Sequence, residues 1–136
     1  MTKEEIISFV NANPTCYLAT VDGDAPHVRA MGMYKADENG ILIQSSTVKG
    51  MYKELLKNPK VELCFNGSGK QVRVSGTAEF IEDKELKEEV LEKRPFLKPL
   101  AEAQGLDAIK VFRVRNAVAT VWTMATNFQP REFIKL

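Results

Sequence analysis

The chain has 136 residues, of which 44% are hydrophobic and 27% are charged, a composition typical of one globular domain with a single core. Nineteen lysines and arginines oppose eighteen aspartates and glutamates, so the formal net charge is only +1. Proteins that bind mainly nucleic acid usually carry a strong basic excess, which this chain lacks. No apolar run approaches the length of a membrane span, and the charged segment Met1–Glu5 lacks the apolar core of a signal peptide. We therefore expect a single cytoplasmic domain, residues 1–136, that binds neither nucleic acid nor membranes.

The two cysteines and the single histidine limit the redox and metal chemistry that the chain can support. Cys16 and Cys64 stand far apart within apolar stretches, as buried thiols in a reducing compartment do. His27 has no second histidine and no nearby cysteine at metal-ligand spacing. We expect no metal site and no disulfide.

The N-terminal part alternates between strands and turns after one helix. Thr2 and Glu5 fit a capping box, and the helix that follows ends at Asn13-Pro14, because the residue before proline is pushed out of the helical region. Alternating apolar residues then predict strands joined by turns at 22–24 and 37–40. The expected elements are a helix at 3–12 and strands at 15–21, 27–36 and 41–46, which form an antiparallel meander.

The remainder of the chain adds more strands and interrupting helices. A helix at 48–57 must stop before Pro59, and Gly76 inside a long strand indicates the bend or bulge that a closed barrel needs. The helix at 84–93 is mostly charged, which we interpret as a solvated face. The other expected elements are strands at 61–66 and 71–81, a short helix within 96–105, a β run at 109–124 broken near 115–116, and an extended tail at 129–136.

These elements indicate a mainly β fold with helices, of the α+β class. Six or seven evenly spaced antiparallel strands with interrupting helices predict a small split β-barrel with flanking helices.

The segment 41–57 combines the features of an anion site. It begins as an apolar strand, passes through the hydroxyl side chains of Ser45, Ser46 and Thr47, and reaches Lys49. It then becomes a helix whose first N–H groups have no partner within the helix, and the helix dipole favours negative charge there.

Arg29 supplies a second cation. Arg29 and Met31 share one face of the second strand, and Gln44 and Ser46 share one face of the third. If these strands pair through the 37–40 turn, the two sets become neighbours, and the result suits a phosphate monoester. The alternative is an exposed arginine, a solvated lysine and an ordinary Ser/Thr helix cap.

Four motifs follow one another in order along residues 15–81. They are Pro26-His27-Val28-Arg29-Ala30-Met31, then Leu42-Ile43-Gln44-Ser45-Ser46, then Lys49 with Asn58-Pro59-Lys60-Val61, then Lys70-Gln71-Val72-Arg73-Val74-Ser75-Gly76-Thr77-Ala78-Glu79. As an ordered set they resemble the FMN-binding split-barrel family typified by pyridoxamine 5'-phosphate oxidase. The C-terminal third resembles that family only loosely, through the β run ending at Trp122.

The resemblance implies a homodimer that binds two FMN molecules at the subunit interface. Carried over by position, its cofactor contacts fall on eleven residues of this chain. Arg29 and Lys49 would hold the FMN phosphate with help from Ser46 or Thr47. Ala30, Met31 and Gly32 would run beside the isoalloxazine ring, and Gln44 and Ser45 would contact the ring edge or ribityl chain. Gln71 would match a flavin-contacting glutamine, and Trp122 would match an aromatic residue that reaches the flavin of the other subunit.

The activity that the resemblance implies is FMN-dependent oxidoreduction, in which electrons or hydride pass to a small-molecule acceptor, with NAD(P)H as a plausible donor. Pyridoxamine 5'-phosphate oxidases carry a C-terminal Arg-x-His, whereas this chain has Pro130-Arg131-Glu132-Phe133. The chain therefore looks more like the small stress-type or nitroimidazole-reductase-like members than like the oxidase itself. The alternatives are a flavin-binding protein without turnover, for storage or sensing, and a split barrel that holds haem or a deazaflavin. No catalytic residue is assigned. His27 is expected at a strand edge without a catalytic role; the alternative, which the resemblance to nitroimidazole reductase relatives implies, is a histidine close to the flavin.

Overall fold

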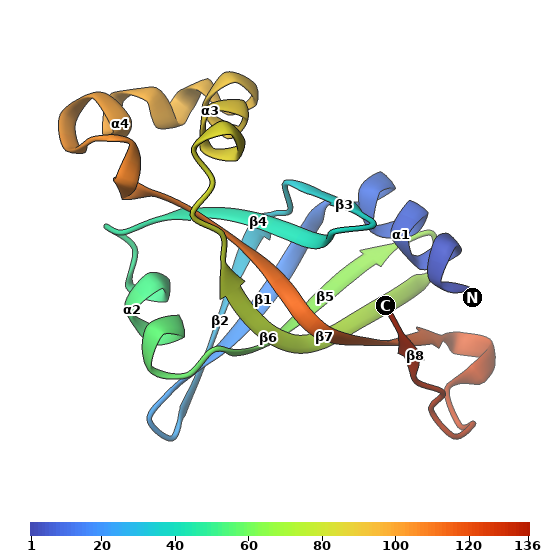
Figure 1. Cartoon of the computed structure of the whole chain (residues 1–136). Coiled ribbons are helices and arrows are strands. Elements are labelled where there is room, and N and C mark those ends of the chain that lie inside the picture. The colour runs from blue at the N-terminus through green and yellow to red at the C-terminus, as the bar shows by residue number, and fades with distance from the viewer.

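Eight strands build one antiparallel sheet in the order β2-β1-β5-β6-β7-β4-β3, with β8 paired to β7 (Figure 1). The computed structural model describes residues 1–136. The strands are β1 Thr15–Asp22, β2 Ala25–Gly32, β3 Lys35–Asp37, β4 Gly40–Ser46, β5 Lys60–Gly67, β6 Lys70–Phe80, β7 Ile109–Thr123 and β8 Ile134–Lys135. The helices are α1 Lys3–Ala12, α2 Gly50–Lys57, α3 Lys84–Lys93 and α4 Lys98–Gln104. The expected antiparallel barrel with flanking helices is confirmed.

The segment expected as one strand at 27–36 is divided into β2 and β3. β2 pairs with β1, whereas β3 pairs with β4. Between them, the N–H of Met33 donates to the Pro14 carbonyl at 2.8 Å and the N–H of Tyr34 donates to the Leu42 carbonyl at 2.9 Å. One bent segment thereby supplies both end strands of the order, β2 and β3, and connects the two edges of the split barrel. The assumed pairing of Arg29 with the third strand is therefore wrong, because Arg29 lies opposite Leu18 on β1.

Two helices cover the barrel core. The capping box of α1 is present, since the Thr2 hydroxyl accepts from the Glu5 N–H at 3.1 Å, and this helix buries Ile6 and Val10. α2 buries Met51 and Leu55 in the same core. Figure 1 shows α1 beside β3 and α2 at the opposite side of the barrel. None of the helices combines the length and the apolar character needed to cross a lipid bilayer.

A second apolar cluster lies under α3 and α4. Leu42 of β4, Val90 of α3, and Ile109 and Val111 of β7 are buried there. α3 begins at Lys84 as expected, since Asp83 caps it, but one of its charges is not solvated. The side chain of Lys87 is only 3% exposed and donates to Glu82. The interpretation of this helix as a charged solvated face is therefore wrong at Lys87.

The bulge indicated by Gly76 is confirmed. The register between β6 and β7 shifts between Ser75 and Thr77, and Asn116 opposite has a φ of 51°. A Cβ atom at Gly76 would lie 2.6 Å from the Arg115 carbonyl oxygen, a contact that real Cβ atoms do not make. Only glycine lets the two strands approach so closely.

Gly76→Ala is expected to lower the free energy of unfolding by about 2 kcal/mol, because the added methyl group overpacks the bulge against backbone. Urea denaturation followed by Trp122 fluorescence measures the change. Gly50→Ala is the control, since a Cβ there meets nothing within 4 Å and alanine favours a helix. Equal losses in the two variants would contradict the steric argument.

The two thiols differ in burial. Cys16 is fully buried, but Cys64 is half-buried, so the expectation that both are buried is wrong for Cys64. Burial raises the pKa of Cys16 to about 11, and it also raises the pKa of Cys64. Both cysteines are free.

We expect Cys16 to stay unmodified by iodoacetamide at pH 8 in the folded protein, because the reactive thiolate is scarce and the sulfur is inaccessible. Mass spectrometry of the Cys64→Ser variant isolates this thiol, and the same variant in urea supplies the reactive control. Rapid labelling without urea would show that the barrel opens at β1.

Candidate functional site

Arg29 joins β2 to α2. Its Nη2 donates to both carboxylate oxygens of Glu54, at 2.9 and 3.1 Å, and its Nη1 donates to the Thr20 hydroxyl at 2.7 Å. Its side chain is 28% exposed. Arg29 lies on the inward face of β2 because it alternates with the outward-facing Val28 and Ala30. The structure thus brings Arg29 to the helix that follows Lys49, through an ion pair rather than through strand pairing.

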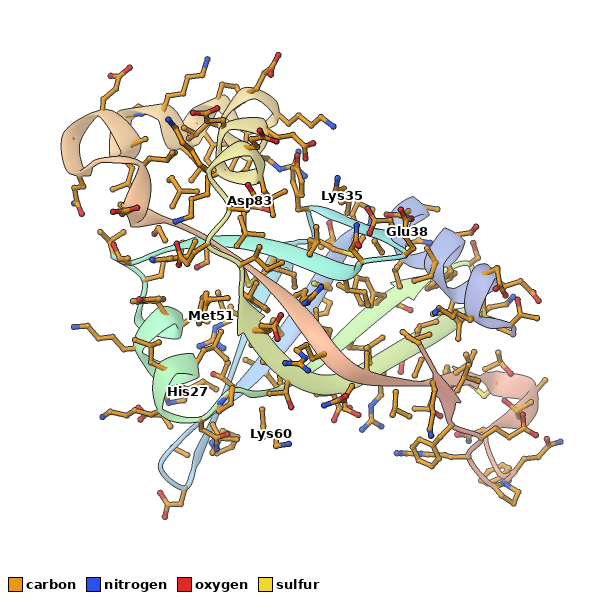
Figure 2. All side chains as sticks on the ribbon, viewed as in Figure 1. His27, Lys35, Glu38, Met51, Lys60 and Asp83 are labelled. Atoms are coloured by element: carbon orange, nitrogen blue, oxygen red, sulfur yellow. The ribbon has the colours of Figure 1, made fainter.

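Glu54 collects three donors. Besides Arg29, the Thr20 hydroxyl donates to it at 2.9 Å, and Nδ1 of His27 lies 2.9 Å from the same oxygen. Burial of Glu54 favours the protonated form, but the hydrogen bonds outweigh it, so the pKa of this carboxyl is lowered. His27 is an exposed residue of β2 that lies beside α2, as Figure 2 shows. Sequence reasoning missed Glu54, although its place three residues after the core residue Met51 indicates a helix face turned toward the sheet.

The end of β4 holds two buried polar atoms without partners. They are Oε1 of Gln44 and Oγ of Ser45. Ser45 continues the inward row of Ile41 and Ile43, whereas Gln44 lies on the face of Leu42. An unsatisfied buried polar group costs about 1–3 kcal/mol, so each atom is a candidate hydrogen-bonding partner for a ligand, although the two atoms lie on opposite faces of β4.

The turn from β4 to α2 leaves a helix N-terminus open. The N–H of Thr47 donates to the Ala108 carbonyl at 3.0 Å, and Lys49 is the N-cap residue of α2. No side chain caps the first turn, so the alternative that Ser46 or Thr47 is an ordinary helix cap is wrong. Lys49 is exposed, and no carboxylate lies within ion-pair distance of it. The free N–H groups of α2 and the cation of Lys49 are what an anion requires.

Lys110 is a neighbour that sequence reasoning did not identify. It lies directly opposite Ser45 in the β4–β7 register. Its Nζ donates to Glu82 at 2.9 Å and lies 5.5 Å from the centre of the Tyr52 ring. The only local signal is a lysine that interrupts the apolar run 109–112. The end of β4 is therefore bordered by two cations, Lys49 and Lys110, of which only Lys49 has no carboxylate partner.

Ala30, Met31 and Gly32 lie on the free edge of the sheet. β2 pairs only with β1, so the backbone groups on its other edge have no strand partner. Met31 packs against the core, whereas Ala30 is exposed and lies opposite Tyr17. Tyr17 and Val28 share that outer face and are 51% and 69% exposed. This edge offers both free backbone groups and apolar surface.

Gln71 and Trp122 lie elsewhere. They face each other across β6 and β7, and they line a cavity of about 550 Å³ together with Lys70, Arg73 and Arg131 of the C-terminal segment. Nε1 of Trp122 donates to Asn127 at 2.8 Å.

The structure separates these two residues from the end of β4. Ser46 pairs with Ile109, and Gln71 pairs with Trp122, so the two places are thirteen residue positions apart along β7. At roughly 3.3 Å per residue this is about 43 Å along the strand. A single chain therefore does not bring Gln71 and Trp122 to Ser45 and Lys49.

Comparison with known proteins identifies the family that the sequence motifs resemble. A family model described as Pyridoxamine 5'-phosphate oxidase matches residues 2–123. No curated protein sequence matches the chain.

Solved structures share the fold. A NimC/NimA family protein of Clostridium acetobutylicum is 27% identical, with 98% of this chain and 92% of that chain covered and a TM-score of 0.79. A pyridoxamine 5'-phosphate oxidase-related, FMN binding protein of Nostoc punctiforme is 12% identical, with 98% and 95% covered and a TM-score of 0.65. HutZ, the haem storage protein of Vibrio cholerae, is 20% identical, with 84% and 89% covered and a TM-score of 0.62. Together with the family match over most of its length, this architecture shows that the chain belongs to the pyridoxamine 5'-phosphate oxidase family.

Proposed function

We propose that this protein binds FMN and acts as an oxidoreductase that passes electrons or hydride to a small-molecule acceptor. The observation that carries the proposal is the open N-terminus of α2, where Lys49 has no carboxylate partner and Ser45 has an unsatisfied buried hydroxyl. Family membership supports a flavin, and one structural neighbour is described as FMN binding. The flavin would supply the redox chemistry, while the protein binds and orients it.

The chain's own residues divide the work of binding. Lys49 and Arg29 hold the phosphate, and the hydroxyls of Ser46 and Thr47 donate to it, because charge-assisted hydrogen bonds suit a dianion. Gln44 or Ser45, which face opposite sides of β4, satisfies its free oxygen on the ribityl chain or ring edge. The unpaired backbone groups along Ala30, Met31 and Gly32 bond to the polar edge of the ring.

The site is completed in a homodimer. Because Trp122 lies far along β7 from the end of β4, and Gln71 pairs with it from β6, both residues contact the flavin held by the other subunit. The exposed face with Tyr17 and Val28 supplies apolar surface for that interface. Sedimentation analysis tests this point, and a monomer that still binds FMN at full affinity would contradict it. The free thiols fit our placement of the protein in the cytoplasm.

An absorption spectrum of the purified protein, before and after incubation with FMN, tests the proposal. We expect bound-flavin bands that bleach anaerobically with NAD(P)H and return when an acceptor is added. A protein that stays colourless after incubation with FMN would contradict flavin binding.

The same experiment separates the alternatives. Tight FMN binding with reduction by dithionite alone supports a storage or sensing protein. A Soret band supports haem as the cofactor. This alternative is included because HutZ, which shares the fold, is a haem storage protein. A deazaflavin spectrum in the purified protein, which added FMN does not displace, supports a deazaflavin as the cofactor.

A further inference from the structure

The Arg29 guanidinium has almost no donors left for a ligand. Its Nη2 is bonded to both oxygens of Glu54, and its Nη1 is shared between the Thr20 hydroxyl and the Leu18 carbonyl, the latter at 3.4 Å. Only the Nε–H has no partner. A bidentate grip on a phosphate needs two parallel N–H groups. Arg29 must therefore release Glu54 before it can hold a phosphate in that way.

Glu54 keeps partners when Arg29 leaves. The hydroxyl of Thr20, a residue only 1% exposed, still donates to it, and Nδ1 of His27 remains within 2.9 Å. A histidine whose Nδ1 carries the proton is a donor to this carboxylate. Because the side chain of Glu54 is only 11% exposed, these two donors matter, since a buried carboxylate without any partner would be costly. Release of Arg29 would therefore leave Glu54 hydrogen-bonded to Thr20 and His27.

We propose that Glu54 is a built-in competitor that occupies Arg29 until a phosphorylated flavin displaces it. The inference rests on the proposed function. It adds a residue, Glu54, that lowers the affinity for a phosphorylated cofactor and leaves the affinity for an unphosphorylated one unchanged. Glu54 and Lys49 lie on the same helix. Glu54 lies five residues after Lys49, about 7.5 Å farther along the helix axis at 1.5 Å per residue, so Arg29 must swing toward the N-terminus of α2 once the pair is broken.

The decisive variant is Glu54→Gln, measured by titration of FMN and of riboflavin, which lacks the phosphate. Glutamine keeps the hydrogen bond to Thr20 but removes the charge that holds Arg29, and charge-assisted bonds are roughly twice as strong as neutral ones. We expect the affinity for FMN to rise about tenfold, equivalent to about 1.4 kcal/mol, while riboflavin binding stays unchanged.

Two further variants serve as a control and as a second test of the competition. Glu79→Gln removes a comparable arginine–carboxylate pair, since Glu79 accepts from Arg113 at 2.6 and 2.9 Å, and is expected to change neither titration. His27→Ala removes the partner that Glu54 keeps after release, so we expect it to weaken FMN binding several-fold and to leave riboflavin binding unchanged.

The outcomes are distinct. Equal or weaker FMN binding by Glu54→Gln, in a wild-type protein that binds FMN, overturns the competition and makes Glu54 a positioning residue for Arg29. An equal gain for FMN and riboflavin overturns it as well, because the phosphate is then not involved. A wild-type protein that binds neither flavin overturns the proposed function, and the competition with it.

Discussion

Glu82→Gln is expected to lower the free energy of unfolding by about 3 kcal/mol, because two lysines lose their shared carboxylate. Oε2 of Glu82 accepts from Lys87 at 2.5 Å, and Oε1 accepts from Lys110 at 2.9 Å. Removing one partner of a buried ion pair typically costs about 3–5 kcal/mol, since the other charge is left uncompensated. We take the lower end because the side chain of Glu82 is 55% exposed and water replaces part of its contribution.

Lys87→Met is the matched control. It removes the buried charge but keeps an unbranched side chain beside the cluster of Leu42, Val90, Ile109 and Val111. We expect its stability to lie within about 1 kcal/mol of wild type, because a hydrophobic replacement for a buried ion is often neutral or better. Urea denaturation measures both variants. Wild-type stability in Glu82→Gln would show that Lys87 finds another partner.

The pH dependence has a definite sign. Hydrogen bonds from Lys87 and Lys110 lower the pKa of Glu82. The unfolded chain therefore takes up this proton first as pH falls, so the stabilisation is complete above the ordinary carboxyl range and is lost as pH falls through the lowered value. Glu82→Gln is expected to show a smaller loss of stability over that acid interval than wild type.

Lys49→Ala is expected to weaken FMN binding by about 1.5–3 kcal/mol, roughly 10- to 150-fold, because it removes a charge-assisted bond to the phosphate. Lys49 is exposed and makes no ion pair within the chain, so its removal leaves the fold intact. Isothermal titration calorimetry with FMN and riboflavin measures the loss, which we expect for FMN alone.

Lys53→Ala is the control for that loss. Lys53 is exposed on the same helix and its removal changes the net charge equally, but it lies one turn beyond the N-terminus. We expect less than about a threefold effect, since the helix-terminal field falls off within the first turn. Equal losses in both variants would indicate a general charge effect rather than a ligand at Lys49.

Sequence signals predicted the elements that local chemistry determines. The helix bounds at 3–12 and 84–93 match α1 and α3, because a capping residue precedes each and a proline follows each. Gly76 marked the bulge for a similar reason, since a missing Cβ is a local property. The ordered motifs likewise predicted the family, which the match over residues 2–123 confirms.

Long-range pairing accounts for what the sequence did not predict. The alternation in 27–36 continues through Met33 and Tyr34, and only the different partners of β2 and β3 reveal the bend. The ion pair of Arg29 with Glu54 needs α2 to lie against β1 and β2. The cofactor residues proposed on β4, α2 and β6 remain predictions until a flavin is titrated.

The pairing of β4 with β7 also constrains when the site can form during synthesis. Ser46 bonds opposite Ile109, so 63 residues must be added after Ser46 before its partner exists. Contacts so distant in sequence form late, because the loop between them must first be closed. The end of β4 therefore remains an unpaired edge on the growing chain, and the proposed flavin site can form only after Ile109 has left the ribosome.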